Sequence, residues 1–219
     1  MPRAAAVIVW LLMPLSSTVF AQNDWELKRD EQGVRVFSRE VADARFDEIR
    51  VETVVRNSSL DAVVAVLRDT PSNPEWVAHC EDAYVIEQIS PTESIVYTRT
   101  DLPFPLRDRW VVSRSQWQQD PDTYQVSMRG RAVDREMSGE QSGVRVTDSR
   151  FSWQLTPMES GDIRIVNQTF LDPNTPIPSW LAQSFMFNGP LTTMQNFQDM
   201  IERPQYRNAD VPFIDSPPD

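Results

Sequence analysis

The feature that most constrains the fold is a series of strand-like segments joined by links too short to hold another element. Six segments rich in β-branched and aromatic residues follow one another, at residues 83–88, 94–100, 109–117, 123–131, 144–155 and 163–171. Several links are short and polar, such as Ser-Pro-Thr-Glu at 90–93 and Asp-Pro-Asp at 120–122. Because a parallel crossover needs about a dozen residues or more, such links favour antiparallel neighbours. The pattern predicts a long antiparallel sheet, which tends to curl.

The first half of the sequence predicts two further strands followed by helices. Residues 33–40 and 46–57 alternate β-branched with polar residues, which indicates two strands and a hairpin. Residues 58–70 begin with two serines, either of which can cap a helix, and then repeat apolar residues at helical spacing. Residues 71–82 carry two prolines ahead of Trp76 and predict a short helix or turn that packs the indole ring against the core.

The last apolar segment, residues 177–203, predicts one long helix with an interruption. Its apolar residues recur at spacings near three and four, which places them on one side of a helix. Polar residues break the run before it reaches the roughly 20 apolar residues of a membrane span. Pro190 follows Gly189 and cannot donate a backbone hydrogen bond, so we expect a bend there. The apolar side then covers the concave face of the sheet, in an α+β fold whose sheet grips the helix.

The N-terminus predicts export. Arg3 precedes an apolar block from Ala4 to Leu15, and small and polar residues lead to Ala21. This order is typical of a secretory signal peptide, with cleavage expected after Ala21. An uncleaved anchor is the alternative, because a single charge precedes the apolar block. The expected divisions are a signal peptide (1–21), one domain (22–203) in the periplasm or outside the cell, and a proline-rich tail (204–219) without further regular structure.

Charge and cysteine content limit which partners the protein can bind and what can stabilise its fold. The chain has a formal net charge of −11 and no basic run, so phosphate backbones and anionic bilayer surfaces repel it. We therefore expect a neutral or amphiphilic ligand and no nucleic-acid partner. Cys80 is the single cysteine, so no internal disulfide can form and the core must supply the stability.

The residue types needed for catalysis do not gather along the sequence. His79 is the single histidine, and no Gly-x-Ser-x-Gly turn surrounds a serine, which argues against a serine hydrolase. His79, Cys80, Glu81 and Asp82 are consecutive and point in different directions, so they do not form a metal shell. The acidic neighbours of Cys80 do not favour a reactive thiolate. We expect no catalytic residue, no cofactor and no bound metal.

Three segments carry a family resemblance. They are Asp69 to Cys80 with Trp76, the Pro-x-Pro-x-x-Asp-Arg turn from Pro103 to Arg109, and Asp172-Pro173 ahead of Ile177-Pro178. In this order they resemble the START domains, the steroidogenic acute regulatory protein-related lipid-transfer family, here of a bacterial exported type. The resemblance spans about residues 25–203. It implies a helix-grip fold with one internal hydrophobic tunnel that holds a single lipid or sterol, and binding or transfer rather than chemistry.

An apolar pocket of this kind usually fixes its ligand with a few polar groups. The charged candidates are Arg99 and Arg114, which lie in strand segments; the alternative for both is an outward, solvated position. The candidates for the apolar wall are large side chains on the strands and the last helix, namely Trp110, Trp153, Trp180, Leu181, Phe185, Leu191 and Met194. The tryptophans can equally be core residues. The last helix is the expected lid, with Pro190 as its weak point.

The sequence therefore predicts a protein that binds, and transfers, a lipid or other hydrophobic molecule, with transient membrane contact. A different class is an enzyme on the same scaffold, a cyclase or hydrolase that acts on a hydrophobic substrate, since fold does not fix function. A third is an envelope interaction protein whose tunnel is filled by its own side chains. The sequence leaves the ligand and the oligomeric state open.

The N-terminal pattern gives the first testable prediction. Expressed in a cell with a secretory pathway, the mature protein should begin at Gln22, because the signal peptidase cuts after the small residue Ala21. N-terminal sequencing of the exported protein measures this directly. A mature chain that starts at Met1 would contradict the prediction.

Overall fold

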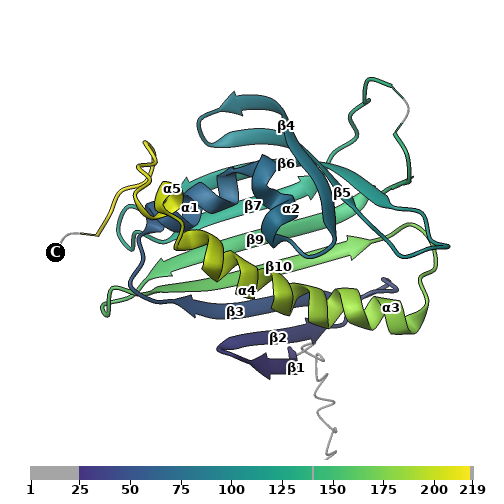
Figure 1. Ribbon diagram of the computed structural model, residues 1–219, viewed down its shortest axis with the longest axis horizontal. Coiled ribbons are helices and arrows are strands. Elements are labelled where there is room, and N and C mark those ends of the chain that lie inside the picture. Colours follow the sequence, from purple (N-terminus) through teal and green to yellow (C-terminus); the bar gives the residue numbers. More distant parts are fainter. Residues whose placement is uncertain (1–24, 140, 218–219) are drawn as a thin grey trace, which may run out of the picture.

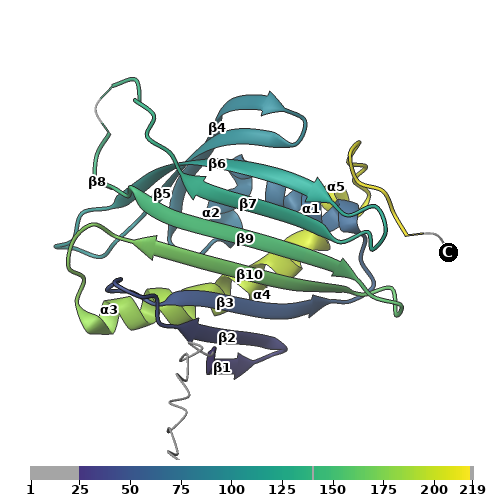
Figure 2. The ribbon, with the colours of Figure 1, turned by 180° about the vertical axis from the view of Figure 1, so that it is seen from behind.

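The computed structural model describes residues 25–139 and 141–217, so the predicted signal peptide lies outside the described residues. One curved sheet carries all the helices on its concave face (Figure 1). The reverse view shows the strands in front and the helices behind them (Figure 2). Within the described ranges, no helix is both long and apolar enough to cross a membrane. The predicted α+β helix-grip arrangement is confirmed.

In the described residues the sheet has ten strands, and nine of them follow the order β1-β2-β3-β10-β9-β7-β6-β5-β4 with antiparallel neighbours. Their bounds are Glu26–Glu31 (β1), Val34–Arg39 (β2), Glu48–Val55 (β3), Cys80–Ser90 (β4), Glu93–Thr100 (β5), Arg109–Gln119 (β6), Val126–Ala132 (β7), Val144–Arg145 (β8), Asp148–Pro157 (β9) and Ile163–Asp172 (β10). The antiparallel pairing predicted from the short links is confirmed.

Two strands differ from the sequence prediction. β1 was not predicted, because its charged residues do not alternate with apolar ones; it is an edge strand held by backbone pairing to β2. The single strand predicted at 144–155 is divided into β8 and β9. β7 ends opposite Ser113, which leaves the start of β6 without a neighbour, and β8 fills that place by parallel pairing at Arg109 and Trp110.

The register decides which side chains face the helices. Side chains opposite one another on paired strands share a face of the sheet. One such row crosses the sheet and contains mostly core residues, namely Val36, Val51, Asn167, Trp153, Met128 and Trp117. The helices therefore pack on the face that carries this row, and residues one position away in each strand lie on the outer face.

Helix α1 (Leu60–Arg68), the 3₁₀ turn η1 (Thr70–Ser72) and helix α2 (Asn73–Trp76) cover one part of the concave face. The side chain of Ser59 caps α1 by accepting a hydrogen bond from Ala62 N at 3.1 Å, as expected for a serine at this position. Trp76 is 3% exposed, so the predicted packing of its indole ring against the core is confirmed.

The C-terminal helix is continuous but irregular. Helix α3 (Ser179–Gln183) leads into a π-helical turn, η2 (Ser184–Asn188), and then into α4 (Gly189–Ile201). Pro190 lies at the start of α4, directly after the π-helical turn. A proline ring clashes with the carbonyl group four residues earlier, and the wider π turn accommodates it. The predicted interruption at Pro190 thus takes the form of a change in helix type.

The tail differs from its prediction, because part of it is regular and packed. Pro204–Arg207 forms helix α5, and Tyr206 Oη donates a hydrogen bond to Asp69 Oδ2 at 2.6 Å. Val211 N donates to Asp61 Oδ1 at 2.8 Å. The Phe213 ring lies 6.3 Å from that of Trp117, between ring centroids. The proline content stops long elements, but buried apolar side chains still fix the segment.

Phe197 of α4 should be the residue whose replacement most weakens the packing of the helix against the sheet. Its ring is fully buried between Trp76 and Trp153, with centroid distances of 4.9 and 5.6 Å. Phe197→Ala should lower the free energy of unfolding by about 3–5 kcal/mol, because it leaves a cavity in the core. Trp180→Ala, at a side chain that is 67% exposed, should change it by less than about 0.5 kcal/mol. Urea unfolding midpoints measure both; similar shifts would contradict the assignment.

Candidate ligand site

The concave face is apolar at one end and polar at the other. At the end under α1, α4 and α5 it carries aliphatic and aromatic side chains, including Val34, Val55, Ile163, Leu155, Val126 and Trp117. At the opposite end, where β10 ends and α3 begins, the face is more polar: the inward positions include Thr98, Ser113, Ser149 and Thr169 beside the apolar Val111, Phe151 and Leu171, and Asn167 follows in the middle row opposite Trp153. Antiparallel pairing brings these residues together, because β6 and β9 begin where β5 and β10 end.

The polar end remains accessible to solvent beneath the helix. Asn167, Thr169 and Phe151 lie on central strands and face inward, yet each is only half-buried. We call this partly accessible region of the concave face, formed by Asn167, Thr169 and Phe151, the hollow. Thr169 Oγ1 donates to Asn167 Oδ1 at 3.3 Å and Asn167 Nδ2 donates to Ser152 O at 3.0 Å, which fixes the orientation of the amide. A Cβ at Gly130 would overlap the Phe151 ring, so this ring forms the floor.

The apolar end is filled by the protein itself. The rings of Trp76 and Trp153 meet edge to face with centroids 6.4 Å apart, and Phe197 contacts both. These three buried side chains occupy the middle of the space in which the sequence predicted a tunnel. A separate cavity of about 70 Å³, between η1 and β6, includes Arg68 and Ser115 in its lining and holds about two water molecules at most.

Arg109 is the buried arginine of this end. It is 5% exposed; Nε donates to Pro173 O at 3.0 Å and Nη2 donates to Thr175 Oγ1 at 2.6 Å. Burial is the main cause that lowers the pKa of its guanidinium group. Its donors thus hold the link between β10 and α3 against the start of β6. The sequence analysis missed this role, although Arg109 is the last residue of the Pro-x-Pro-x-x-Asp-Arg turn.

The two halves of the C-terminal helix are held differently. α4 is tied to its surroundings by hydrogen bonds, from Ala78 N to Thr193 Oγ1 at 3.0 Å and from Gln198 Nε2 to Thr53 Oγ1 at 2.9 Å. Its apolar side chains Met194, Phe197, Met200 and Ile201 are buried. α4 is therefore a fixed part of the core.

The contacts of η2 are weaker. Phe185 stacks on the exposed ring of His79 at 4.2 Å between centroids, and Phe187 lies 5.9 Å from the guanidinium of Arg29. Arg29 also makes a long hydrogen bond of 3.5 Å to Asn188 Oδ1. Met186 and Phe187 of η2 also pack against the core cluster, but only partly buried. η2 is thus held by partly buried contacts, whereas α4 is held by fully buried side chains.

The predicted wall residues are divided between core, hollow and surface. Trp153, Leu191 and Met194 are buried in the main core cluster. Leu181 is also buried, on α3 and outside that cluster, and Phe185 is half-buried against His79. Trp180 is the exposed one. The structure therefore brings Leu181 and Phe185 to the accessible half of the helix, and the other buried residues to the fixed core.

Arg99, Arg114 and Trp110 do not face the interior. Their positions in β5 and β6 alternate with the inward residues, which places all three on the outer face. Arg114 pairs there with Glu93. Trp110 lies between Tyr97, at 6.1 Å between centroids, and the guanidinium of Arg145, at 5.2 Å. The outward alternative that the sequence left open for the two arginines is the one observed.

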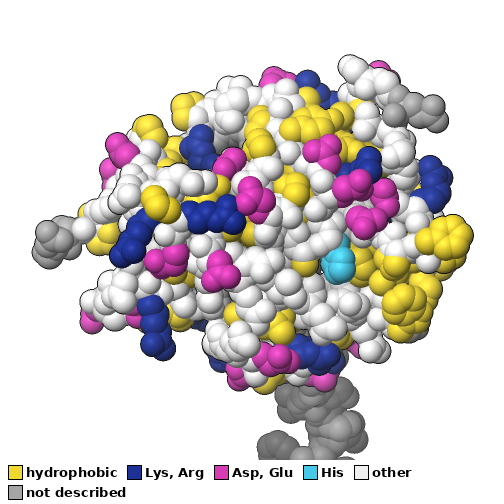
Figure 3. Space-filling model, in the orientation of Figure 1, with side chains coloured by type: hydrophobic (Ala, Val, Ile, Leu, Met, Phe, Trp, Pro, Cys, Tyr) yellow, Lys and Arg dark blue, Asp and Glu magenta, His cyan; other side chains and the backbone are white. Residues whose placement is uncertain are grey.

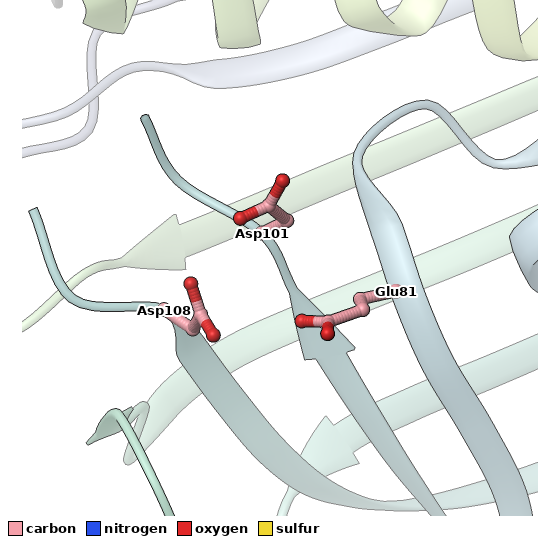
Figure 4. A group of neighbouring side chains, drawn as sticks. All are labelled: Glu81, Asp101 and Asp108. Atoms are coloured by element: carbon pink, nitrogen blue, oxygen red, sulfur yellow. The ribbon is translucent and has the colours of Figure 1, made fainter. Parts of the chain in front are cut away.

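Three carboxylates gather near the predicted Pro-x-Pro turn. Glu81, Asp101 and Asp108 have ligand oxygens within 4.8 Å of one another (Figure 4). Arg99 already supplies a cation here, since Nε lies 2.8 Å from Glu81 Oε2 and 3.4 Å from Asp108 Oδ2. The group is better explained as an ion-pair cluster than as a metal site. Next to it, an open surface depression of about 640 Å³ lies between residues 106–108 and 141–143.

The chemistry of Cys80 and His79 does not support a nucleophile. Burial, and next the charge of Asp82, raise the pKa of the Cys80 thiol to about 11, so the thiol is protonated at neutral pH. His79 stacks on Phe185, and its backbone has a positive φ of 63°. The thiolate that a cysteine nucleophile would need is therefore not available at neutral pH.

Large apolar side chains are exposed at the end of the molecule where α3 begins. Phe104, in the link between β5 and β6, is 97% exposed, and Trp180 is 67% exposed. Both views place this link and α3 at the same end. In Figure 3, hydrophobic side chains gather at this edge, beside the single histidine. We call this end of the molecule, with Phe104 and Trp180, the aromatic end. It adjoins the hollow.

Comparison with known proteins agrees with this architecture. The START domain model matches residues 16–204. An uncharacterized protein of Pseudomonas aeruginosa is 26% identical over 181 residues, which cover 82% of this chain and 88% of the relative. A STAR-related lipid transfer protein fragment from Xanthomonas axonopodis superposes with a TM-score of 0.73 and 25% identity, over 82% of this chain and 99% of that one.

The human StAR-related lipid transfer protein 5 has a TM-score of 0.72 at 18% identity, over 81% of this chain and 86% of that one, and so supports the fold alone. The likeness covers the large antiparallel sheet and the C-terminal helix. With this fold and a family match over most of its length, the chain belongs to the START domain family.

Proposed function

We propose that this protein binds one lipid or similar amphiphilic molecule, with its polar head between the polar end of the sheet and the helical segments α3 and η2. The observation that carries the proposal is the half-buried, inward-facing pair Asn167 and Thr169 beneath the irregular half of the helix. A polar group with an apolar floor, Phe151, suits a ligand with a polar head. The name of the Xanthomonas relative, a lipid transfer protein, points in the same direction.

We further propose that the ligand enters by displacement of α3 and η2 while α4 stays in place. The weak point is the π-helical turn before Pro190, where regular helical hydrogen bonding changes. Lids are drawn from the least stable parts of a fold, and the contacts of η2 through His79 and Arg29 fit that description. Exchange then needs no opening of the core around Phe197.

The aromatic end supports transfer through transient contact with a membrane. Phe104 and Trp180 are aromatic side chains exposed beside the hollow, and aromatic rings favour the interface between lipid and water. The N-terminal pattern at residues 1–21 supports a location in the periplasm or outside the cell. In this proposal the protein carries its ligand without changing it, since neither Cys80 nor the ion-paired carboxylates provide an activated group.

Ligand retention should depend on the inward face of β10. Asn167→Leu removes the amide group that should contact the ligand head. It should reduce the amount of co-purifying lipid by about tenfold, as expected for the loss of one charge-assisted hydrogen bond, or change the head group of that lipid. Gln168→Leu is the matched control, because the adjacent residue points to the outer face. Mass spectrometry of solvent extracts measures both. Equal lipid content in the two variants would contradict the site, and a chemically altered lipid would favour an enzyme.

The lid gives a separate kinetic prediction. Pro190→Ala restores a backbone donor and should regularise the helix, so uptake and release of a fluorescent lipid should slow by more than the affinity changes. Thr192→Ala, at an exposed position on α4, is the control. Hydrogen exchange should also show weaker protection over 179–188 than over 191–201. Uniformly strong protection with equal exchange rates would mean that the entrance lies elsewhere.

A further inference from the structure

The outer face of the sheet is basic although the chain is acidic. In the described residues, eight arginines lie on it, at outward positions of the six adjacent strands β2, β3, β10, β9, β7 and β6. They are Arg35, Arg39, Arg50, Arg114, Arg129, Arg131, Arg150 and Arg164. The carboxylates that pair with them are Glu48, Glu52 and Glu93. Asp148 and Asp172 add two carboxylates at outward positions, so eight positive against five negative charges leave an excess of three on a chain of net charge −11. We call this surface the arginine face.

Three of these arginines stand directly opposite one another. Arg150 of β9 pairs in register with Arg131 of β7, which pairs with Arg114 of β6. Like charges at opposed positions repel and cost stability. Arg114 is relieved by Glu93, and Arg150 lies over the Phe170 ring at 4.1 Å and 3.7 Å from Glu48. The row is thus an unfavourable arrangement for the isolated protein, only partly compensated.

The middle of the row has no partner. Arg131 and the nearby Arg129 are exposed, and neither makes a hydrogen bond or ion pair with any residue in the ranges that the structure describes. Glu48 and Glu52 are buried beneath the neighbouring arginines, at 8% and 6% exposure, so their charge is covered by guanidinium groups. Towards the aromatic end the face stops at the opposed acids Asp148 and Asp172.

No helix in the described part of the fold covers this face, since the helices all lie on the concave side (Figure 2). At one edge the Trp25 ring lies over Arg39 and Arg50, at 4.4 and 5.8 Å from the two guanidinium groups. We propose that the arginine face binds the phosphate groups of an anionic bilayer. Guanidinium groups match phosphate oxygens in geometry as well as in charge. An anion between Arg129 and Arg131 would also relieve the repulsion within the row.

The choice of a bilayer as partner rests on the proposed function, because a lipid carrier must return to the membrane that holds its ligand. Arg131 lies one residue before the end of β7, and Arg150 two residues after the start of β9. This is the end of the sheet at which α3 begins. A bilayer bound there lies beside the hollow, whereas net charge alone predicts that the protein is repelled.

The test is co-sedimentation of the purified mature protein with phosphatidylcholine vesicles, with and without phosphatidylglycerol at about one third of the lipid. Wild type should bind the anionic vesicles only, and lose binding between about 0.05 and about 0.5 M salt. The double variant Arg129→Gln/Arg131→Gln should bind roughly 10- to 30-fold more weakly. Arg56→Gln/Arg207→Gln removes two exposed charges elsewhere and should bind like wild type.

Two further measurements separate the possible failures. Thermal unfolding should show the Arg129→Gln/Arg131→Gln variant at least as stable as wild type at low salt, because it loses repulsion and no ion pair. Its co-purifying lipid should be unchanged. Wild-type binding that does not depend on phosphatidylglycerol, or equal binding by both double variants, would contradict membrane binding by the arginine face. Neither result would contradict the proposed lipid carriage. Binding to duplex DNA but not to vesicles would overturn the choice of partner. Protein that binds anionic vesicles but never contains lipid would instead count against the carrier.

Discussion

The structure depends on the packing of Phe197 between Trp76 and Trp153. These rings join three segments far apart in the sequence: the short helix α2, strand β9 and helix α4. Burial of three aromatic side chains supplies much of the local driving force and excludes water from the middle of the concave face. Because a disulfide cannot form in a chain with one cysteine, this apolar contact does the work of a cross-link.

Fixing α4 in this way decides how the remainder of the helix behaves. Everything after Pro190 is held by buried side chains, and the tail adds Tyr206 and Phe213 at the apolar end. Before Pro190, the π-helical turn and α3 extend over the polar end with fewer constraints. In the proposed function, one closed end and one loosely covered end leave a single direction for ligand entry. Arg109 keeps that cover attached, since it binds the backbone and hydroxyl groups of the link that leads into α3.

The two faces of the sheet have opposite electrostatic roles. On the concave face the polar end has hydroxyl and amide groups and one guanidinium group, that of Arg109, whose donors are engaged by Pro173 O and Thr175 Oγ1. On the outer face, arginines surround the two buried glutamates Glu48 and Glu52 and then continue without acids across β7. Buried carboxylates that receive several guanidinium groups stay compensated, but the surplus of arginine remains exposed. Net charge is therefore a poor guide to what an individual surface of this protein attracts.

The sequence by itself determined the elements that depend on local pattern. Short links required antiparallel strands, the serine at 59 began α1, Trp76 entered the core and Pro190 interrupted the last helix. The sequence did not predict the charged strand β1 or the division of residues 144–155 into two strands, because pairing with neighbouring strands decides both. The tertiary structure alone decided which side of each strand faces the helix. β6 carries large apolar residues on both sides, with Val111 and Trp117 inward and Trp110 and Val112 outward, so its pattern does not identify the inner face. A shift of register by one residue exchanges the two faces, and this is the physical reason why Arg99 and Arg114 could be named but not oriented.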